Sequence, residues 1–241
     1  MDLDQYIKLS IEEDVKNGDH STLSCIPENK IGSAELLIKE SGIIAGIEIA
    51  KSIFKTFDEN IIFKPVLKDG QKVEIGDIAF IVSGPSKSLL TIERLILNVM
   101  QRMSAISTLT EKFVRKLDGL NTKILDTRKT TPLNRFLEKK AVKIGGGFNH
   151  RFGLYDMIML KDNHIDFAGG IKSAIEKSNR YVINKGLDMK IEIETRNLDE
   201  LKQVLEYGKV DRIMLDNFNF NDLKTAMENR IPIIYLVDSA S

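Results

Sequence analysis

The stretch "KIEIETRNLDELKQVLEYGKVDRIMLDN", residues 190–217, decides the fold class. Its two ends are short runs rich in isoleucine, and the segment between them has the apolar spacing of a helix. Strand, helix and strand in this order predict a βα unit whose two strands run parallel. The strand runs are β-branched and nearly continuous, which is typical of parallel strands that are buried on both faces.

The same alternation begins at Lys123 and continues to the end of the chain, which predicts further parallel βα units. The other expected strands are "KILDT" (123–127), "YDMIMLKD" (155–162) and "IPIIYLVD" (231–238). The other expected helices are "LNRFLEKKAVKIG" (133–145), "AGGIKSAIEKSNRYVINKG" (168–186) and "FNDLKTAMENR" (220–230).

The first half of the chain has a different texture. Short strand-like runs and turns fill residues 1–85, including "SAELLIKES" (33–41) and the alternating segment "KDGQKVEIGDIAFIVSGP" (68–85), which predicts short antiparallel strands. A long helix is expected over residues 88–117, and its apolar residues cover more than one face, so it is either buried or faces a second subunit. We therefore expect a small α+β domain over residues 1–117, with its long linking helix, and a parallel α/β domain over residues 118–241.

The composition is that of an ordinary globular protein and excludes several classes of function. Lys plus Arg and Asp plus Glu each number 35, so a global positive field that would bind nucleic acid is not expected. Cys25 is the single cysteine, which excludes a disulfide framework and a cysteine-rich zinc site. The N-terminus is acidic and unlike a signal peptide, and no apolar run approaches the ~18 residues of a membrane span. We expect a cytoplasmic location, with no nucleic-acid or membrane partner.

Polar side chains follow each predicted strand of the second half, where the strand ends. In parallel α/β folds, ligands bind outside the carboxyl ends of the strands, so these side chains are expected to project toward one mouth. A charged group after one strand would be ordinary, but a polar group after every strand is harder to explain as chance. The residues are Asp126, Thr127, Arg128, Lys129, Lys161, Asp162, Asn163, His164, Glu192, Glu194, Thr195, Asp216, Asn217, Asp238 and Ser239.

Cationic groups are concentrated near this mouth by "LDTRKTTPLNR" (125–135) and "GGGFNHRFG" (145–153). Because the guanidinium fork suits carboxylates and phosphates, the cations predict a small ligand with several negative charges. Two facing acids suit sugar hydroxyls, a divalent cation or a developing positive charge. The cations are Arg128, Lys129, His150, Arg151 and Lys161, and the acids are Glu194 and Asp216.

Two features stay open on the residues alone. Residues 145–147 are three consecutive glycines, which fit a helix stop and flexible turn as well as a close backbone approach to a ligand. Arg94 and Arg102 lie in the long apolar helix, where the simplest interpretation is that their stems cover apolar surface and their heads reach water. No P-loop, dinucleotide glycine motif or activated nucleophile stands out.

The blocks "LDTRKTTP", "GGGFNHRFGLYDMIMLKDNHI", "IEIET" and "IMLDNF" resemble, in order, those of nicotinate-nucleotide pyrophosphorylase (carboxylating), the quinolinate phosphoribosyltransferase family. Upstream, "TIERLILNVMQRMSAIST" resembles the long helix of the family, and "EEDVKNGDHST" resembles its N-terminal block. The resemblance covers the chain from about residue 10 to its end. It implies a small N-terminal α+β domain packed beside an incomplete, TIM-like α/β barrel.

The resemblance also implies a reaction. Quinolinate and phosphoribosyl pyrophosphate would give nicotinate mononucleotide, carbon dioxide and pyrophosphate, with Mg²⁺ required, as the entry to NAD from the de novo pathway. It implies a homodimer in which Arg94 is supplied by the partner subunit. The other substrate-binding residues that it implies are Thr127, Arg128, Lys129, His150, Arg151, Lys161, Glu194 and Asp216, with catalysis assigned to Lys129, Lys161, Glu194 and Asp216 and the metal to Glu194 and Asp216.

Three departures from the family pattern carry expectations. Leu133 stands where the family has glycine, and a positive φ there would strain it. Ala105 also replaces a glycine, within a helix, where the effect should be mild. The chain stops at Ser241 where the family continues, so we expect a truncated copy that is weak or inactive as written. The alternatives are a molybdenum-associated or nicotinate-using relative, and a non-catalytic protein that keeps the anion pocket.

Overall fold

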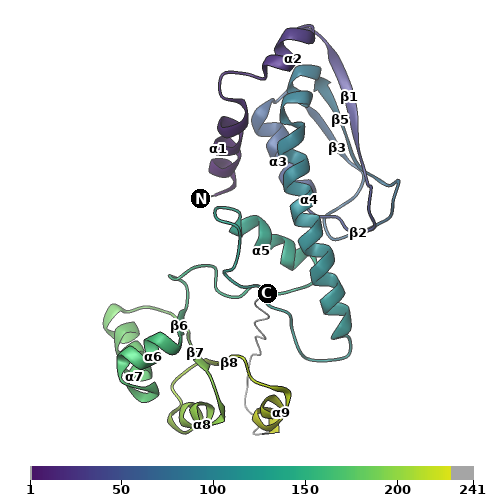
Figure 1. The fold of residues 1–241 in the computed structure, drawn as a ribbon. Coiled ribbons are helices and arrows are strands. Elements are labelled where there is room, and N and C mark those ends of the chain that lie inside the picture. The colour runs from purple at the N-terminus through teal and green to yellow at the C-terminus, as the bar shows by residue number, and fades with distance from the viewer. Residues whose placement is uncertain (1, 229–241) are drawn as a thin grey trace. The chain divides into compact units, whose positions relative to one another are not determined.

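A computed structural model of the protein describes residues 2–228 (Figure 1). The expected strand over residues 231–238, with Asp238 and Ser239, lies outside the described residues. The chain divides into two compact units, Met1–His150 (unit 1) and Arg151–Ser241 (unit 2). This division falls after Leu117, where we placed the domain boundary, because the helix over Arg135–Ile144 belongs to the core of unit 1 through Leu137 and Ala141. The domain boundary itself stays a prediction.

Unit 1 is a small α+β structure, as expected. Strands β1, β5 and β3 form an antiparallel sheet in that order, and β2 pairs antiparallel with β4. The elements are α1 (Leu3–Val15), α2 (His20–Cys25), β1 (Ile31–Leu37), β2 (Gly42–Ile43), α3 (Ile47–Phe57), β3 (Ile62–Pro65), β4 (Lys72–Val73), β5 (Ile78–Pro85), α4 (Ser86–Lys116) and α5 (Arg135–Ile144).

Helix α4 is the long helix that the sequence predicts, and Figure 1 shows it running beside the sheet of unit 1. One face of the helix enters the core through Ile92, Ile96 and Met103. Other apolar side chains of α4 are exposed, among them Leu90 and Leu109. Helix α4 is therefore apolar on more than one face, but within unit 1 only part of its circumference is buried.

Helices α1 and α2 were not expected. Each begins at an aspartate whose carboxylate accepts a hydrogen bond from a backbone N–H in the first turn, Asp2 from Gln5 at 2.8 Å and Asp19 from Thr22 at 3.1 Å. Such N-caps satisfy donors that the first turn of a helix otherwise leaves without partners. The hydrogen bonds from Thr22 also hold the pKa of Asp19 below its usual value.

Unit 2 contains a parallel sheet with strand order β6-β7-β8 and a helix after each strand, which confirms the expected α/β architecture. Helix α6 was not expected, because its sequence is too short to display a helical period. The elements are β6 (Ile158–Leu160), α6 (Asp162–Ala168), α7 (Ile171–Lys185), β7 (Ile191–Thr195), α8 (Leu198–Tyr207), β8 (Arg212–Leu215) and α9 (Phe220–Glu228).

The two faces of the unit 2 sheet differ in chemistry. Ile191 and Ile193 of β7 pack in one apolar cluster with Leu201 and Val204 of α8. Because successive side chains of a strand point to opposite faces, Glu192 and Glu194 lie on the other face. Both glutamates are nevertheless buried. Strand β7 is therefore buried on both faces, as expected, but one of those faces carries charge.

The expected strand over residues 123–127 is wrong. Leu125 makes only an isolated parallel bridge with Phe148, in which the Asp126 N–H donates to the Phe148 carbonyl at 3.0 Å. A turn follows at once, closed by the Thr130 N–H and the Arg128 carbonyl at 2.9 Å. The turn leaves too few consecutive pairs for a strand, although the apolar run is of the right composition.

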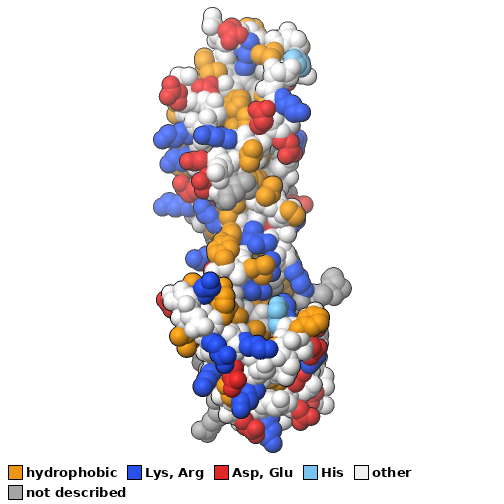
Figure 2. All heavy atoms as spheres, turned by 90° about the vertical axis from the view of Figure 1, so that its left-hand side faces the viewer, with side chains coloured by type: hydrophobic (Ala, Val, Ile, Leu, Met, Phe, Trp, Pro, Cys, Tyr) orange, Lys and Arg blue, Asp and Glu red, His pale blue; other side chains and the backbone are white. Residues whose placement is uncertain are grey.

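Among residues 2–228, none of the helices combines the length and the apolar character that crossing a lipid bilayer requires. Figure 2 shows acidic and basic side chains interspersed over the face that it draws. That distribution agrees with the zero formal net charge of the chain.

Candidate functional site

The loop of residues 126–135 in unit 1 carries two of the predicted cations, Arg128 and Lys129, and ends at Arg135. The Lys129 N–H donates to Thr127 Oγ1 at 3.0 Å, and the guanidinium Nε of Arg135 donates to Thr130 Oγ1 at 3.1 Å. Both threonine hydroxyls therefore fold the loop upon itself, as side chains of this type commonly do in turns. The loop is ordered by its own residues.

Arg128 offers an open donor in this loop. Its Nε is buried and has no hydrogen-bond partner among residues 2–228. A buried donor of this kind costs free energy unless something accepts from it, so an anion that reached Arg128 would satisfy it. Lys129 lies beside it with an exposed side chain.

Leu133 adopts a left-handed conformation, with a φ of 66°. This is the positive φ that, as noted from the sequence, would strain a residue other than glycine, because the Cβ of leucine crowds the backbone there. The leucine side chain is 71% exposed, so packing does not compensate for the strain.

The three glycines after α5 serve close packing against α4. A Cβ at Gly145 would lie 2.4 Å from the carbonyl oxygen of Ser107, and one at Gly147 would lie 3.0 Å from Thr110 Cγ2. Gly146 has a φ of 89°, which side chains rarely adopt. Close packing and positive φ therefore explain why glycines occupy residues 145–147. The chain then continues to His150, which is buried.

The arginines of α4 differ from each other. Arg94 is exposed on the helix surface. Arg102 donates to Glu138 Oε1 from Nη2 at 2.9 Å and from Nε at 3.1 Å, and to Thr131 Oγ1 at 3.2 Å. The Arg102 side chain is 56% exposed, so its head reaches water as expected, and its guanidinium also joins α4 to α5 and to the loop of residues 126–135.

A cavity of about 540 Å³ lies in unit 1 and is lined mainly by apolar residues such as Leu37, Ile43 and Met100. None of the predicted site residues lines it. Its lining contains two lysines, Lys39 and Lys112, but neither belongs to the predicted site.

In unit 2, Lys161 and Glu194 form an ion pair at the carboxyl ends of β6 and β7. The register explains the pair, because Leu160 of β6 lies opposite Ile193 of β7, so the next residues along each strand are also neighbours. Glu194 is 9% exposed, whereas the Lys161 side chain is 43% exposed. One carboxylate is thus held by a cation that solvent can still reach.

Asp216 follows β8 at the same end of the sheet. Its N–H donates to the carbonyl of Thr195 at 3.0 Å, which extends the β7–β8 pairing by one step. Met214 pairs with Glu194 in register, and by the alternation of side chains Asp216 shares their face. Lys161, Glu194 and Asp216 therefore occupy one face at one end of the sheet, and we call them the strand-end triad.

Arg151 is the first residue of unit 2 and is partly buried. Its Nη1 donates to the carbonyl of Met157 at 3.3 Å, just before β6. The guanidinium therefore lies against the approach to the strand that ends at Lys161.

Magnesium is usually held by one or two carboxylates together with substrate phosphates. Glu194 and Asp216 supply such a pair on one face of the sheet. Residues 2–228 contain no group of three or more metal-binding side chains. The two carboxylates fit a Mg²⁺ whose coordination the substrate completes, and Glu194 would be shared between this ion and Lys161.

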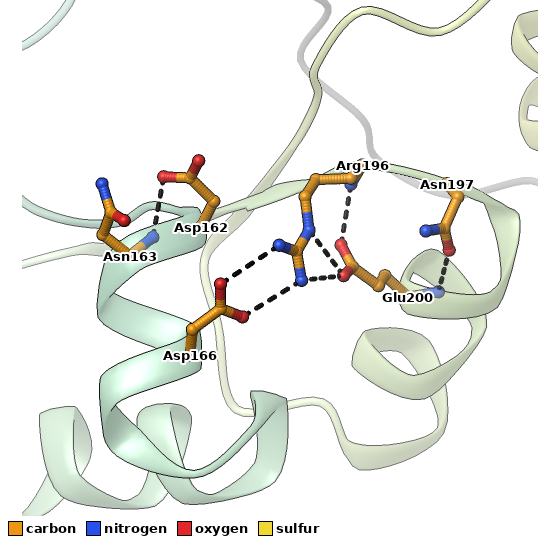
Figure 3. A network of polar contacts seen from close by, with 6 residues as sticks. All are labelled: Asp162, Asn163, Asp166, Arg196, Asn197 and Glu200. Atoms are coloured by element: carbon orange, nitrogen blue, oxygen red, sulfur yellow. Dashed lines mark hydrogen bonds and ion pairs between the residues drawn. The ribbon is translucent and has the colours of Figure 1, made fainter.

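A polar network beside the triad went unnoticed in the sequence (Figure 3). The guanidinium of Arg196 donates to both oxygens of Asp166 on α6 at 3.3 Å and to Glu200 Oε1 on α8 at 2.8 and 2.5 Å. The hydrogen bonds to Glu200 and Asp166 raise the pKa of Arg196 above its usual value. The network ties α6, which begins directly after Lys161, to the segment that follows Glu194.

A second missed feature is the buried pair of Lys139 and Asp126 in unit 1. Asp126 was among the polar residues noted after a predicted strand, but Lys139 was not singled out. In the sequence, Lys139 and Lys140 are equivalent lysines of one helix, and only the structure separates the buried one from the exposed one.

Two family models match the chain. The model described as "Quinolinate phosphoribosyl transferase, C-terminal domain" matches residues 106–236, and the N-terminal domain model of the same family matches residues 19–104. Together the two matches span most of the chain.

Curated relatives carry corresponding names. The chain is 44% identical over 222 residues to the chloroplastic nicotinate-nucleotide pyrophosphorylase [carboxylating] of Arabidopsis thaliana, a match that covers 90% of this chain and 63% of the relative. It is 44% identical over 205 residues to a probable nicotinate-nucleotide pyrophosphorylase [carboxylating] of Bacillus subtilis, covering 85% and 69%. The chain thus spans less than two thirds of the length of the plant relative.

Solved structures agree with the fold. NadC from Streptococcus pyogenes has a TM-score of 0.91 at 35% identity, over 99% of this chain and 84% of that chain. The nicotinate-nucleotide pyrophosphorylase of Francisella tularensis has a TM-score of 0.89 at 35% identity, over 98% and 83%. Human nicotinic acid phosphoribosyltransferase, at 11% identity and a TM-score of 0.54, shares the fold alone.

Proposed function

The chain belongs to the quinolinate phosphoribosyl transferase family, and from that premise we propose that the protein transfers a phosphoribosyl group to quinolinate. The donor is phosphoribosyl pyrophosphate, and the products are nicotinate mononucleotide, carbon dioxide and pyrophosphate. The nucleotide product enters NAD biosynthesis. The observation that carries the proposal is the strand-end triad, Lys161, Glu194 and Asp216, in a chain that matches both domain models of the family.

Quinolinate binding is the first step. Its two adjacent carboxylates repel each other, so fixed cations are needed to hold both. The proposal assigns the cations Arg128 and Lys129 and the buried His150 of unit 1 to quinolinate binding, and it assigns the cations Arg151 and Lys161 of unit 2 to the same role. The buried Nε of Arg128 supports this role, because a carboxylate would give it the acceptor that residues 2–228 do not. Thr127 holds the Lys129 backbone through its hydroxyl.

Glycosyl transfer follows. The pyridine nitrogen attacks the anomeric carbon, and the bond from that carbon to pyrophosphate breaks. Positive charge develops on the ribosyl group, and the carboxylate of Glu194, oriented by Lys161, stabilises it. Glu194 and Asp216 would hold Mg²⁺, which offsets the charge of the leaving pyrophosphate when it is bound.

Decarboxylation completes the reaction. The bond between the ring and the 2-carboxylate breaks, its electrons stay on the ring beside the quaternised nitrogen, and a proton takes the place of carbon dioxide. The side chains orient the charged groups, and no covalent enzyme intermediate is required.

The proposal includes a homodimer and a location. Arg94 is exposed on α4 and would be supplied to the site of a partner subunit. A cytoplasmic location is proposed from the single cysteine, which suits a reducing compartment. Equilibrium sedimentation of the purified protein, and of Arg94→Ala beside it, tests the dimer.

The reaction is tested by its stoichiometry. Quinolinate labelled in the 2-carboxyl group is incubated with phosphoribosyl pyrophosphate and Mg²⁺, and released carbon dioxide and nucleotide are counted. We expect one carbon dioxide for each nucleotide. Nucleotide formed from nicotinate without carbon dioxide would indicate a nicotinate-using enzyme, and tight quinolinate binding without product would indicate a non-catalytic binding protein.

A further inference from the structure

Lys139 of α5 is a lysine with almost no solvent exposure, at 1%. Its ammonium group forms an ion pair with Asp126 Oδ1 and donates to the backbone carbonyl of His150 at 3.2 Å. Asp126 Oδ1 also accepts from the His150 N–H at 2.9 Å. One buried pair therefore holds the N–H and the carbonyl of His150, and it also holds the side chain of Asp126, the residue that precedes Thr127.

Glu138, the neighbouring residue of α5, binds the other end of the loop that begins at Asp126. Glu138 is 6% exposed, its Oε1 accepts from Arg102, and its Oε2 accepts from the Thr131 N–H at 3.3 Å. Residues 127–130 thus lie between Asp126, whose carboxylate pairs with Lys139, and Thr131, whose backbone N–H donates to Glu138.

Stability alone does not account for a lysine in this place. Removing two charges from water is costly, and replacing a buried ion pair by apolar residues of similar volume is often neutral or stabilising. The pair instead fixes the orientation of specific backbone groups through charged hydrogen bonds. An apolar side chain in its place would make no such bonds.

We propose that Lys139 is a positioning residue for the quinolinate site. Through Asp126 it orders the backbone of residues 127–129 and of His150, and so presents their side chains to the diacid. The inference rests on the proposed function, because it takes these residues as the quinolinate-binding groups. Lys139 itself is buried and contacts neither substrate.

The test uses the whole protein with Asp126 and Lys139 changed together. Lys139→Met alone leaves a buried carboxylate without its cation and also lowers folding stability. The double variant Asp126→Asn/Lys139→Met removes both charges and keeps an amide oxygen for the His150 N–H. Lys140→Met is the matched control, because Lys140 is the adjacent exposed lysine of the same helix.

Titration calorimetry with quinolinate separates positioning from folding, because the stoichiometry reports the folded fraction and the Kd reports the site. In the double variant we expect unchanged stoichiometry and a Kd raised roughly 10-fold or more, given the usual size of lost charged hydrogen bonds. Lys140→Met should match the parent in both quantities. A double variant with the parent Kd overturns the inference, as does a lower stoichiometry at the parent Kd.

Hydrogen exchange supplies a readout that does not depend on the ligand. Amides of residues 126–131 and of His150 should exchange faster in the double variant, while those of α4 stay protected. A parent protein that fails to bind quinolinate refutes the proposed function, and the exchange data then judge the ordering role separately. Unchanged exchange in that segment refutes the ordering role.

Discussion

Leu133 is the residue at which local strain is clearest. An L-residue in the left-handed region costs roughly 1–2 kcal/mol, whereas glycine adopts it freely. With a φ of 66° and a mostly exposed side chain, leucine gains little packing in return. The strain is stored in the loop that carries Arg128 and Lys129.

Leu133→Gly should therefore stabilise the protein. The relief of strain exceeds the entropy that glycine adds to the unfolded chain, so we expect a gain of about 0.5–1 kcal/mol in the free energy of unfolding. Leu133→Ala keeps the Cβ and is the control. Urea unfolding curves of the two variants are compared, and a glycine variant no more stable than the alanine variant would contradict the account.

Asp58 provides a residue-scale prediction of how folding stability depends on pH. Ser88 Oγ donates to Asp58 Oδ2 at 2.6 Å, and this bond holds the pKa of Asp58 below its usual value of 3.8. A carboxyl whose pKa is lowered by folding stabilises the protein above the unfolded pKa, and this contribution is lost as the pH falls through the folded value.

Ser88→Ala should consequently destabilise the protein by about 0.5 kcal/mol near neutral pH, a small effect because Asp58 is partly solvated. The difference should shrink as the pH is lowered from neutral into strong acid, through the lowered pKa of folded Asp58. Ser52→Ala is the control, since Ser52 Oγ donates to the carbonyl of Glu48 and not to a titrating group. Urea midpoints at both pH values decide, and a pH-independent effect of Ser88→Ala would count against the assignment.

At the scale of elements, the contact of α5 with α4 positions the residues of unit 1. The chain leaves α5 through Gly145, whose missing side chain allows the Ser107 carbonyl to approach. That approach sets where the following segment lies, including the strand-like bridge of Phe148 with Leu125 and the buried His150.

Gly145→Ala should loosen this contact. The added methyl would meet backbone as well as side-chain atoms of α4, so neither neighbour can turn away, and overpacking of this kind costs about 1–3 kcal/mol. Lys143→Ala, at an exposed position of α5, should be nearly neutral. Thermal unfolding compares the two, and equal midpoints would show that α4 accommodates the methyl.

Strand β7 explains how the strand-end triad arises. Its "IEIET" sequence alternates apolar side chains, which α8 covers, with glutamates on the opposite face. The pairing of β6 and β7 then brings the Lys161 cation to Glu194. All five residues of β7 are buried, as the sequence predicts, but one face of the strand is charged and carries the chemistry.

At the scale of the whole molecule, the sequence predicted the elements with a clear period. The helix over residues 86–116 and the βα units around β7 and β8 follow from apolar spacing alone. Helix α6 was not predicted, because its seven residues are too few to establish a helical period of apolar residues. The strand expected at residues 123–127 failed because composition does not reveal whether a neighbouring strand is available.

The candidate site also contains residues that the sequence predicts and residues that it does not. Polar residues after strands are visible in the sequence, since topology brings the ends of parallel strands to one edge. The partners that hold them, such as Lys139 for Asp126 and Arg196 for Asp166 and Glu200, are tertiary contacts. No local pattern distinguishes these cations from the solvated lysines and arginines around them.

The account depends on Glu194 as the carboxylate that meets the developing ribosyl charge. The measurement is the rate of carbon dioxide release from quinolinate by the parent, by Glu194→Gln and by Glu206→Gln, a control at an exposed glutamate of α8. The account predicts that Glu194→Gln lowers kcat roughly 100-fold or more with the quinolinate Kd little changed, and that Glu206→Gln matches the parent. A Glu194→Gln variant that turns over at the parent rate would contradict it.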